Sequence, residues 1–285
     1  RENVLGLEVV LADGRVIETG GRVRKASNGY DLTRLFIGSE GTLGVITKIR
    51  LRLHGIPEAM SAAVCQFPDL AGAVNTTIAT MQSGIPVARI ELLDADQMGA
   101  CVAYSKLEGC RATPTLFLEF HGTHAAVKEQ AEAVEAIAAD YGGEGFAWAT
   151  EAEARNRLWK ARHDAYWAAL ALVPGWRGIT TDICVPISKL AEAILGAKGD
   201  AEARGHTTCI VGHVGDGNFH QVILYDPKVE GALERAWEMD RLIVARGLAL
   251  GGTCSGEHGV GLGKREFLEQ EHGVEALAVM RGIKT

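Results

Sequence analysis

The sequence lacks a Cys-x-x-Cys pair, a basic stripe and a long apolar segment free of polar residues. Its six cysteines are widely spaced: Cys65, Cys101, Cys110, Cys184, Cys209 and Cys254. In a chain of 285 residues this spacing is typical of buried thiols in a reducing compartment, and it argues against a disulfide framework. We therefore expect a cytoplasmic location.

The missing basic stripe bears on nucleic-acid binding. The net charge is −7, and the 29 Lys and Arg residues are scattered along the chain. Proteins that bind a duplex concentrate positive charge on one face, where it releases counterions from the phosphates. We therefore expect no nucleic-acid partner.

The longest uncharged stretch, residues 70–88, bears on membrane insertion. It contains polar side chains such as Asn75 and Gln82, and it is interrupted by Gly84 and Pro86. A spanning helix needs about 20 predominantly apolar residues, so this stretch is too polar and too broken. No transmembrane segment is predicted.

Size and composition are those of a globular protein with unusually many glycines. The chain is 47% hydrophobic and 23% charged, which suits one large domain or two smaller ones. Its 35 glycines in 285 residues exceed the usual level of roughly 7%. The chain starts at Arg1 without Met or a signal-peptide pattern and is expected to begin inside a strand, so we expect a fragment.

Hydrophobic periodicity predicts an α+β fold. Before Pro57, two apolar runs around Asp13-Gly14 predict a β-hairpin, and a glycine-rich block at 38–44 leads into a β-branched stretch at 45–51. After Pro57, strands are predicted at 62–67, 88–92, 115–120, 178–185, 208–212 and 219–224, and helices at 70–82, 95–105, 124–141, 151–172, 187–204 and 230–246. This alternation predicts a sheet on one side and helices on the other.

Two glycine-rich segments hold the most reactive side chains. His213 and His220 flank a turn-rich loop between two predicted strands, so they can converge from adjacent strands. With Glu257 from the second segment, they form a plausible set of metal ligands with an open position for substrate. The simpler interpretation, ordinary polar residues beside a turn, explains one histidine better than it explains the set.

His258 directly follows Glu257, and adjacent residues rarely both face one small ion. A sensible division makes Glu257 a ligand and His258 a proton acceptor, because an unperturbed imidazole titrates near pH 6.5. A surface histidine in a glycine loop is the alternative.

Two further features are weaker signals. Arg162 lies on a predicted helix face between Trp159 and Tyr166, where a guanidinium could hold a carboxylate bidentately or simply be solvated. The glycines of the 38–44 block could let backbone N–H groups meet a phosphate or an adenine ring. From the chemistry alone, a plain turn entering a strand is the safer interpretation of that block.

Several segments together resemble a known family. Gly29-Tyr30-Asp31-Leu32-Thr33 through Gly38-Ser39-Glu40-Gly41-Thr42-Leu43-Gly44-Val45-Ile46-Thr47 resembles the second half of the flavin domain of FAD-linked oxidases of the vanillyl-alcohol-oxidase type. Residues 181–188, 212–220 and 251–264 are similar to the D-lactate dehydrogenase (cytochrome) branch, whose relatives include the glycolate oxidase flavoprotein subunit and D-2-hydroxyglutarate dehydrogenase. The resemblance covers nearly the whole chain.

The resemblance implies an FAD enzyme that oxidises a D-2-hydroxy acid to a 2-keto acid. In this family the positions of His213, His220 and Glu257 bind a divalent metal, that of His258 is the base, and that of Arg162 binds the substrate carboxylate. The residues expected to contact FAD are Gly38, Ser39, Glu40, Gly41, Gly44, Val45, Ile46 and, at the flavin edge, Asn218. Zn²⁺ suits two imidazoles and a carboxylate best, with Mn²⁺ and Fe²⁺ as alternatives.

The same resemblance implies a domain organisation. Residues 1–56 are expected to close a flavin-binding α+β domain, and residues 57–250 to form a cap or substrate domain whose antiparallel sheet is covered by helices. Residues 251–285 are expected to return to the flavin face. By the same resemblance, the family's N-terminal flavin half and C-terminal tail are expected to be absent from this chain.

The substrate and partners follow from smaller differences. The hydroxyglutarate branch has a lysine where Thr180 and Thr181 stand in this chain. The absence of that cation argues against a dicarboxylic substrate and favours D-lactate or a similar monocarboxylate. The resemblance implies an electron acceptor and leaves open whether it is a cytochrome, a quinone or an electron-transfer flavoprotein. Peripheral membrane association, a mitochondrial location in a eukaryote, and a homodimer are further expectations. The rival hypotheses are a metal-dependent hydrolase and a non-catalytic flavoprotein subunit.

Overall fold

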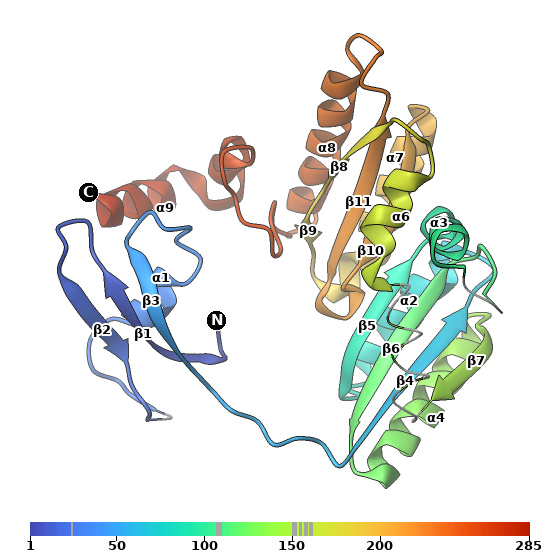
Figure 1. The fold of residues 1–285 in the computed structure, drawn as a ribbon, viewed down its shortest axis with the longest axis horizontal. Coiled ribbons are helices and arrows are strands. Elements are labelled where there is room, and N and C mark those ends of the chain that lie inside the picture. The colour runs from blue at the N-terminus through green and yellow to red at the C-terminus, as the bar shows by residue number, and fades with distance from the viewer. Residues whose placement is uncertain (24, 107–109, 150–152, 154–155, 157–158, 160–161) are drawn as a thin grey trace. The chain divides into compact units, whose positions relative to one another are not determined.

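The computed structural model describes residues 1–23, 25–106, 110–149, 153, 156, 159 and 162–285. The described residues form two units (Figure 1). Unit 1 consists of Arg1–Ile56 and Gly259–Thr285, and unit 2 of Pro57–His258. Among the described residues, no helix combines the length and the apolar character that a membrane span requires.

Unit 1 is built on a three-stranded antiparallel sheet in the order β2-β1-β3. Its elements are β1 (Val4–Val10), β2 (Val16–Gly20), α1 (Leu32–Phe36), β3 (Val45–Leu51), the 3₁₀-helix η3 (Arg265–Phe267) and α9 (Leu268–Lys284). The predicted hairpin around Asp13-Gly14 is confirmed, because Val10 pairs with Val16 and the register continues along both strands. Its small core holds Leu7, Val9 and Phe36.

Unit 2 contains an eight-stranded sheet whose strand pairings, among the described residues, are all antiparallel. The strand order is β7-β4-β6-β5-β10-β11-β8, with β9 also paired to β11. The strands are β4 (Ala59–Gln66), β5 (Val87–Leu93), β6 (Thr115–Gly122), β7 (Glu144–Ala149), β8 (Arg177–Thr180), β9 (Ile183–Cys184), β10 (Thr207–Gly212) and β11 (Asn218–Tyr225). The helices are α2 (Leu70–Gln82), α3 (Ala95–Ser105), α4 (His124–Asp140), α6 (Ala165–Ala171), α7 (Leu190–Ala203) and α8 (Ala232–Ala249), with 3₁₀-turns η1 (Ile187–Lys189) and η2 (Val214–Asp216).

Helices lie on both faces of this sheet, so the expectation of helices on one side only is wrong. Successive residues of β10 point to opposite faces. Ile210 belongs to the large core formed with α2, α4, α7 and α8, whereas Val211 belongs to a second core formed with α3 and α6. The second face is the one on which Trp159 is buried.

Most predicted elements are present at nearly the predicted bounds. The bounds of α2 and α3 agree with prediction because Asp69 and Asp94 cap their first turns, each accepting a hydrogen bond from a backbone N–H. The predicted helix 151–172 includes residues outside the described part, and its described end forms α6. Strand β7 and helices α1 and α9 were not predicted.

The predicted strand 178–185 is interrupted at Thr181-Asp182, between β8 and β9. There the Thr181 carbonyl accepts a hydrogen bond from His220 Nδ1 at 3.0 Å. The Thr181 carbonyl thus accepts from a side chain and not from the backbone of a neighbouring strand. The Asp182 carboxylate accepts from the backbone N–H groups of Glu257 and His258. The break in the strand therefore lies at the two residues that bind His220 and the backbone of His258.

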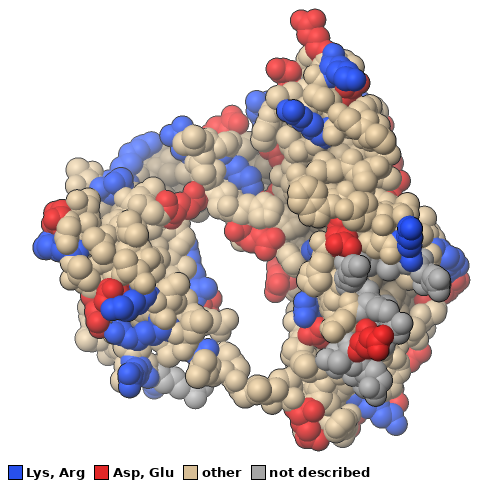
Figure 2. All heavy atoms as spheres, in the orientation of Figure 1, with Lys and Arg blue, Asp and Glu red and all other residues tan. Residues whose placement is uncertain are grey.

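Surface charge is mixed in sign. On the face of unit 2 seen in Figure 2, acidic (red) and basic (blue) side chains are interspersed, and the same holds for unit 1. The described ion pairs are mostly exposed surface pairs, each of which contributes about 0–1 kcal/mol to stability.

Candidate functional site

The connection between β10 and β11 brings two histidines together. His213 follows β10 directly, and His220 lies within β11, opposite Val211. Gly217 closes the intervening turn with φ of 80°, and a Cβ there would lie 2.2 Å from the Val185 carbonyl oxygen. The imidazole centroids of His213 and His220 are 5.9 Å apart, with the rings nearly perpendicular.

Three imidazole nitrogens face one carboxylate oxygen, Glu257 Oε1. The Nε2 atoms lie 3.0 Å away for His220, 3.4 Å for His213 and 3.6 Å for His258. Glu257 and His258 come from the loop that follows α8, more than thirty residues after β11. All four predicted reactive residues of unit 2 are thus brought together.

His220 is oriented by its other ring nitrogen. Its Nδ1 donates to the Thr181 carbonyl oxygen, which leaves Nε2 as the unprotonated nitrogen facing Glu257. The ring is almost fully buried, and burial lowers its pKa because desolvation disfavours the imidazolium. A neutral imidazole with a fixed tautomer is the form in which histidine binds a metal.

His213 is oriented by a buried carboxylate on β5. Its Nδ1 lies 2.6 Å from Glu91 Oε1, and that hydrogen bond raises the pKa of His213. The second oxygen of Glu91 accepts a hydrogen bond from Arg162 Nε at 2.9 Å. Arg162 is thereby linked to the histidine cluster through Glu91, a residue that the sequence reasoning missed.

Asp182 organises the loop that carries Glu257 and His258. Its carboxylate accepts hydrogen bonds from the backbone N–H groups of Glu257 and His258, at 3.0 and 2.8 Å, and from the Ser255 hydroxyl at 2.8 Å. Asp182 is fully buried. Sequence reasoning missed its role, although an acidic residue inside an apolar predicted strand was a usable signal.

The donor atoms suit a divalent cation. Among the described residues, one ligand atom from each of Asp182, His220, Glu257 and His258 lies within 4.8 Å of the others. His213 is outside this group, but its Nε2 faces the same Glu257 oxygen. Because both His213 and His220 have Nδ1 occupied by an oxygen acceptor, the imidazole and carboxylate donors fit Zn²⁺, Mn²⁺ or Fe²⁺.

A cavity of about 380 Å³ opens onto this cluster. It is lined by Cys184, His213, Asp216, Asn218, Gly256 and Glu257. Gly256 allows a close approach here, because a Cβ at that position would lie 2.4 Å from the Asn218 amide nitrogen. Asn218 donates to Asp182 at 3.3 Å, and its buried Oδ1 has no hydrogen-bond partner among the described residues.

The predicted flavin-contact residues at 38–46 lie in unit 1. Gly38 and Gly41 have positive φ, and so does Glu40, with φ of 52°. The Glu40 carboxylate accepts hydrogen bonds from the backbone N–H groups of Val260 and Gly261, at 2.7 and 2.8 Å. This part of the block therefore holds the segment that follows His258 in the chain.

The rest of that block enters the sheet of unit 1. Ser39 accepts a hydrogen bond from the Thr42 hydroxyl, and a Cβ at Gly44 would collide with Val9. Val45 and Ile46 begin β3 with exposed side chains. Exposed apolar residues at the start of a strand are compatible with contact to a ligand or to further polypeptide.

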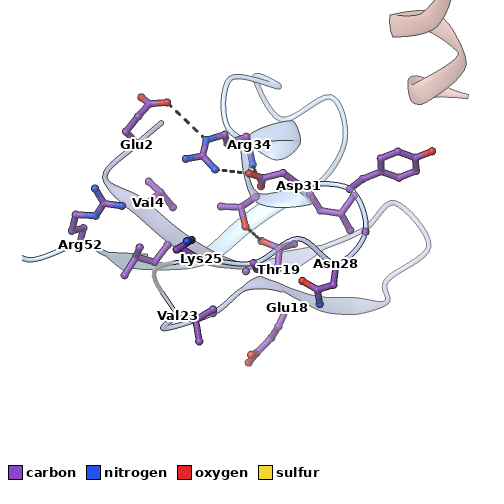
Figure 3. Close-up of a pocket in the computed structure, with 18 residues that line it drawn as sticks. Glu2, Val4, Glu18, Thr19, Val23, Lys25, Asn28, Asp31, Arg34 and Arg52 are labelled. Carbon is purple, nitrogen blue, oxygen red and sulfur yellow. Dashed lines mark hydrogen bonds and ion pairs between the residues drawn. The ribbon is translucent and has the colours of Figure 1, made fainter.

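Unit 1 has a cavity of its own, with a larger volume of about 600 Å³. Figure 3 shows Arg34 there, paired with both Glu2 and Asp31. The hydroxyl oxygens of Thr19 and Thr33 are 2.8 Å apart. None of the predicted site residues lines this cavity. The residues with reactive chemistry thus gather at the smaller cavity of unit 2.

A family model described as FAD linked oxidases, C-terminal domain, matches residues 56–285. Along its full length the chain is 52% identical to a probable mitochondrial D-lactate dehydrogenase of Danio rerio and covers 58% of that protein. It is 47% identical to the mitochondrial D-lactate dehydrogenase [cytochrome] of Arabidopsis thaliana, covering 50%, and 34% identical to the glycolate oxidase subunit GlcD of Bacillus subtilis, covering 60%. The chain thus spans a little over half the length of these relatives.

Solved structures of similar fold have low sequence identity. A 4-ethylphenol oxidase from Gulosibacter chungangensis matches 98% of the chain and 62% of its own length, with a TM-score of 0.73 and 17% identity. A p-cresol methylhydroxylase matches 99% of the chain and 62% of its own length, with a TM-score of 0.72 and 18% identity. These likenesses establish the fold alone.

Proposed function

The chain belongs to the family of FAD linked oxidases, C-terminal domain, and we propose that its protein oxidises a small D-2-hydroxy acid, D-lactate first, to the 2-keto acid. The observation that carries this proposal is the convergence of three imidazole Nε2 atoms on Glu257 Oε1 beside a cavity. The same cluster is linked to a buried arginine through Glu91. Such a site can hold a cation, a base and a carboxylate anchor together.

We propose His213, His220 and Glu257 as the ligands of a divalent metal, most simply Zn²⁺, with Mn²⁺ and Fe²⁺ as alternatives. Both imidazoles present Nε2, because Nδ1 of each is engaged by an oxygen. When bound, such a metal acts as a Lewis acid on the hydroxyl and carboxylate oxygens of the substrate. Asp182 supports the site by fixing the backbone around Glu257.

His258 is the proposed base. Its side chain is half exposed, whereas that of His220 is almost fully buried, so of these two imidazoles His258 is the more accessible to an entering substrate. It would take the proton from the substrate hydroxyl as the C–H bond at C2 breaks. Its backbone N–H donates to Asp182, which holds the base in position.

Arg162 is the proposed anchor for the substrate carboxylate. Its Nε is held by Glu91, which leaves the two terminal amino groups of the guanidinium for a bidentate contact. The side chain is largely buried, with 15% exposed. Burial strengthens a contact between a guanidinium and a carboxylate because water competes less.

FAD is the proposed redox cofactor, contacted by Gly38, Ser39, Glu40, Gly41, Gly44, Val45, Ile46 and Asn218. When bound, it would accept the hydride released from C2 of the substrate. We further propose that residues 1–56 complete a flavin-binding domain, residues 57–250 form the cap or substrate domain, and residues 251–285 return to the flavin face. Positive φ at Gly38 and Gly41 supports close backbone approach in the flavin segment.

A small monocarboxylate is the favoured substrate class. The cavity of about 380 Å³ is small, and Thr180 and Thr181 supply no cation for a second carboxylate. Three relatives carry the name D-lactate dehydrogenase [cytochrome], so a cytochrome is the favoured electron acceptor, with a quinone or an electron-transfer flavoprotein as alternatives. In a eukaryote the protein is proposed to be mitochondrial, as those relatives are named, and a homodimer is the proposed assembly.

Anaerobic reduction of the flavin tests this proposal. The holoprotein is mixed with D-lactate, L-lactate or D-2-hydroxyglutarate, and the flavin absorbance is followed. We expect rapid bleaching by D-lactate only. A metal-containing protein without flavin, unreactive toward all of these acids, would favour a metal-dependent hydrolase, and a flavoprotein reduced by none of them would favour a non-catalytic subunit.

A further inference from the structure

Glu91 joins two parts of the site that are far apart in sequence. Its Oε2 accepts from Arg162 Nε, 71 residues away, and its Oε1 contacts His213 Nδ1, 122 residues away. Resting on the function proposed above, we propose that Glu91 is a positioning residue that fixes the metal ligand His213 and the carboxylate anchor Arg162 in one geometry.

Burial makes this carboxylate suited to that role. Glu91 is 5% exposed on the strand β5, in the interior of the unit 2 sheet. A buried carboxylate must find donors for both oxygens, and here the donors are the two residues of the site. Because the strand is held by β6 on one side and β10 on the other, the carboxylate has little freedom to move.

The contact with His213 sets which ring nitrogen is free. A carboxylate can only accept a hydrogen bond, so the proton of the neutral ring stays on Nδ1 and Nε2 faces Glu257. The contact with Arg162 sets the direction of the guanidinium. Since Nε is held by Glu91, the edge formed by the terminal amino groups is turned away from that carboxylate.

A neighbouring carboxylate provides a matched comparison. Glu119 on β6 also joins an arginine and a histidine, with Oε2 at 2.9 Å from Arg89 and Oε1 at 2.7 Å from His121. It is 7% exposed, close to the 5% of Glu91. Neither Arg89 nor His121 lines the cavity of unit 2, so Glu119 has the same chemistry at a different place.

The test compares Glu91→Gln with Glu119→Gln in the holoprotein. A glutamine amide offers one acceptor oxygen and one donor nitrogen, so it cannot accept from both Arg162 and His213. If the amide nitrogen of the glutamine faces His213, it donates to Nδ1 and favours the tautomer whose proton is on Nε2. A protonated Nε2 cannot bind a metal. Zn²⁺ affinity by chelator competition, the absorption spectrum after Co²⁺ replacement, and KM and kcat for D-lactate are then measured.

We expect Glu91→Gln to weaken Zn²⁺ affinity about 10- to 100-fold, as for loss of other supporting partners of metal-bound histidines. KM for D-lactate should rise on the order of tenfold, because the anchor loses a charge-assisted hydrogen bond. Glu119→Gln should leave the Zn²⁺ affinity and the KM for D-lactate within about twofold of the wild type. Glu91→Asp, which keeps the charge but is one methylene too short to span both partners, should shift both quantities in the same direction.

The outcomes separate the two proposals. A wild-type holoprotein that binds no metal and does not oxidise D-lactate overturns the proposed function, and this inference falls with it. A wild type that binds metal and oxidises D-lactate, with both Glu91 variants unchanged in metal affinity and KM, overturns the role of Glu91 alone. Equal losses in Glu119→Gln would also overturn it, since any buried carboxylate would then have the same effect.

Discussion

The imidazole rings of His220 and His258 are stacked, with centroids 4.8 Å apart and planes 3° from parallel. Two stacked imidazoles do not easily carry positive charge together, and His258 is one of the groups that lower the pKa of His220, after the larger effect of burial. Burial therefore favours the neutral form of His220, which is the form in which a histidine binds a metal.

Replacement of the proposed base should affect turnover more than binding. We expect His258→Ala to lower kcat for D-lactate by about 10²- to 10⁴-fold with a small change in KM, because proton transfer is lost but the anchor and ligands stay. His121→Ala, which alters a carboxylate-paired histidine outside the cluster, is the control. Near-normal turnover in His258→Ala would remove the base assignment.

Replacement of a proposed ligand should instead reduce metal content. Glu257→Gln and His220→Ala each remove a donor from the cluster, so both purified variants should contain less metal per flavin than the wild type. Elemental analysis beside flavin absorbance measures this ratio. Full metal content in either variant would exclude that residue from the ligand set.

Glu40 should hold the segment after His258 through two backbone hydrogen bonds. Glu40→Ala removes the acceptor for Val260 and Gly261, so we expect faster amide hydrogen exchange at those two positions. Glu18→Ala, which removes an exposed partner of Arg50 in the same unit, should leave them unchanged. Unaltered exchange in Glu40→Ala would show that the carboxylate is not what orders this segment.

A buried ion pair between α7 and the start of α3 should matter for stability. Lys198 Nζ contacts Asp94, which is 1% exposed, at 2.8 Å, and burial raises the pKa of that carboxyl. Lys198→Met leaves this group without its cation and should lower the free energy of unfolding by about 3–5 kcal/mol in urea titrations.

Two comparisons control that prediction. Lys128→Met breaks an exposed pair with Glu132 and should cost less than about 1 kcal/mol. Adding Asp94→Asn to Lys198→Met should recover part of the loss, because the uncompensated acid is removed. A loss in Lys198→Met no larger than in Lys128→Met would contradict the account.

Thiol labelling tests the expectation of buried cysteines. Burial raises the pKa of Cys65 to about 11, so at pH 8.5 little of it is the reactive thiolate. The reactive fraction grows as the pH approaches 11. We expect iodoacetamide to label Cys65 in the native protein more slowly than the less buried Cys110, and both quickly in urea. Equal native rates, read by mass spectrometry, would count against the burial of Cys65.

Local patterns predicted most of the secondary structure. The bounds of α2 and α3 could be predicted because their capping aspartates stand directly before apolar periodic runs. Strand β7 was missed because it is largely exposed, contains a glycine with positive φ, Gly145, and has no clear apolar alternation. The break between β8 and β9 was missed because it depends on a hydrogen bond to His220 in another strand.

The reactive residues of the site could be selected from the sequence, but their supports could not. His213, His220, Glu257 and His258 stand out as histidines and a carboxylate among glycines. Glu91 lies inside strand β5 and Asp182 lies at the break between β8 and β9, and the site residues that they hold are 71 or more residues away. Spacing along the chain carries no information about such contacts, which arise only when the sheet forms.

Removal and return of the metal in the flavin-loaded protein tests the central claim most directly. D-lactate and L-lactate are each supplied with a dye acceptor, before chelation, after chelation, and after Zn²⁺, Mn²⁺ or Fe²⁺ is added back. The account predicts dye reduction by D-lactate only, its loss on chelation with the flavin retained, and its recovery with at least one of these metals. Undiminished D-lactate oxidation by a protein shown to contain no metal would contradict it.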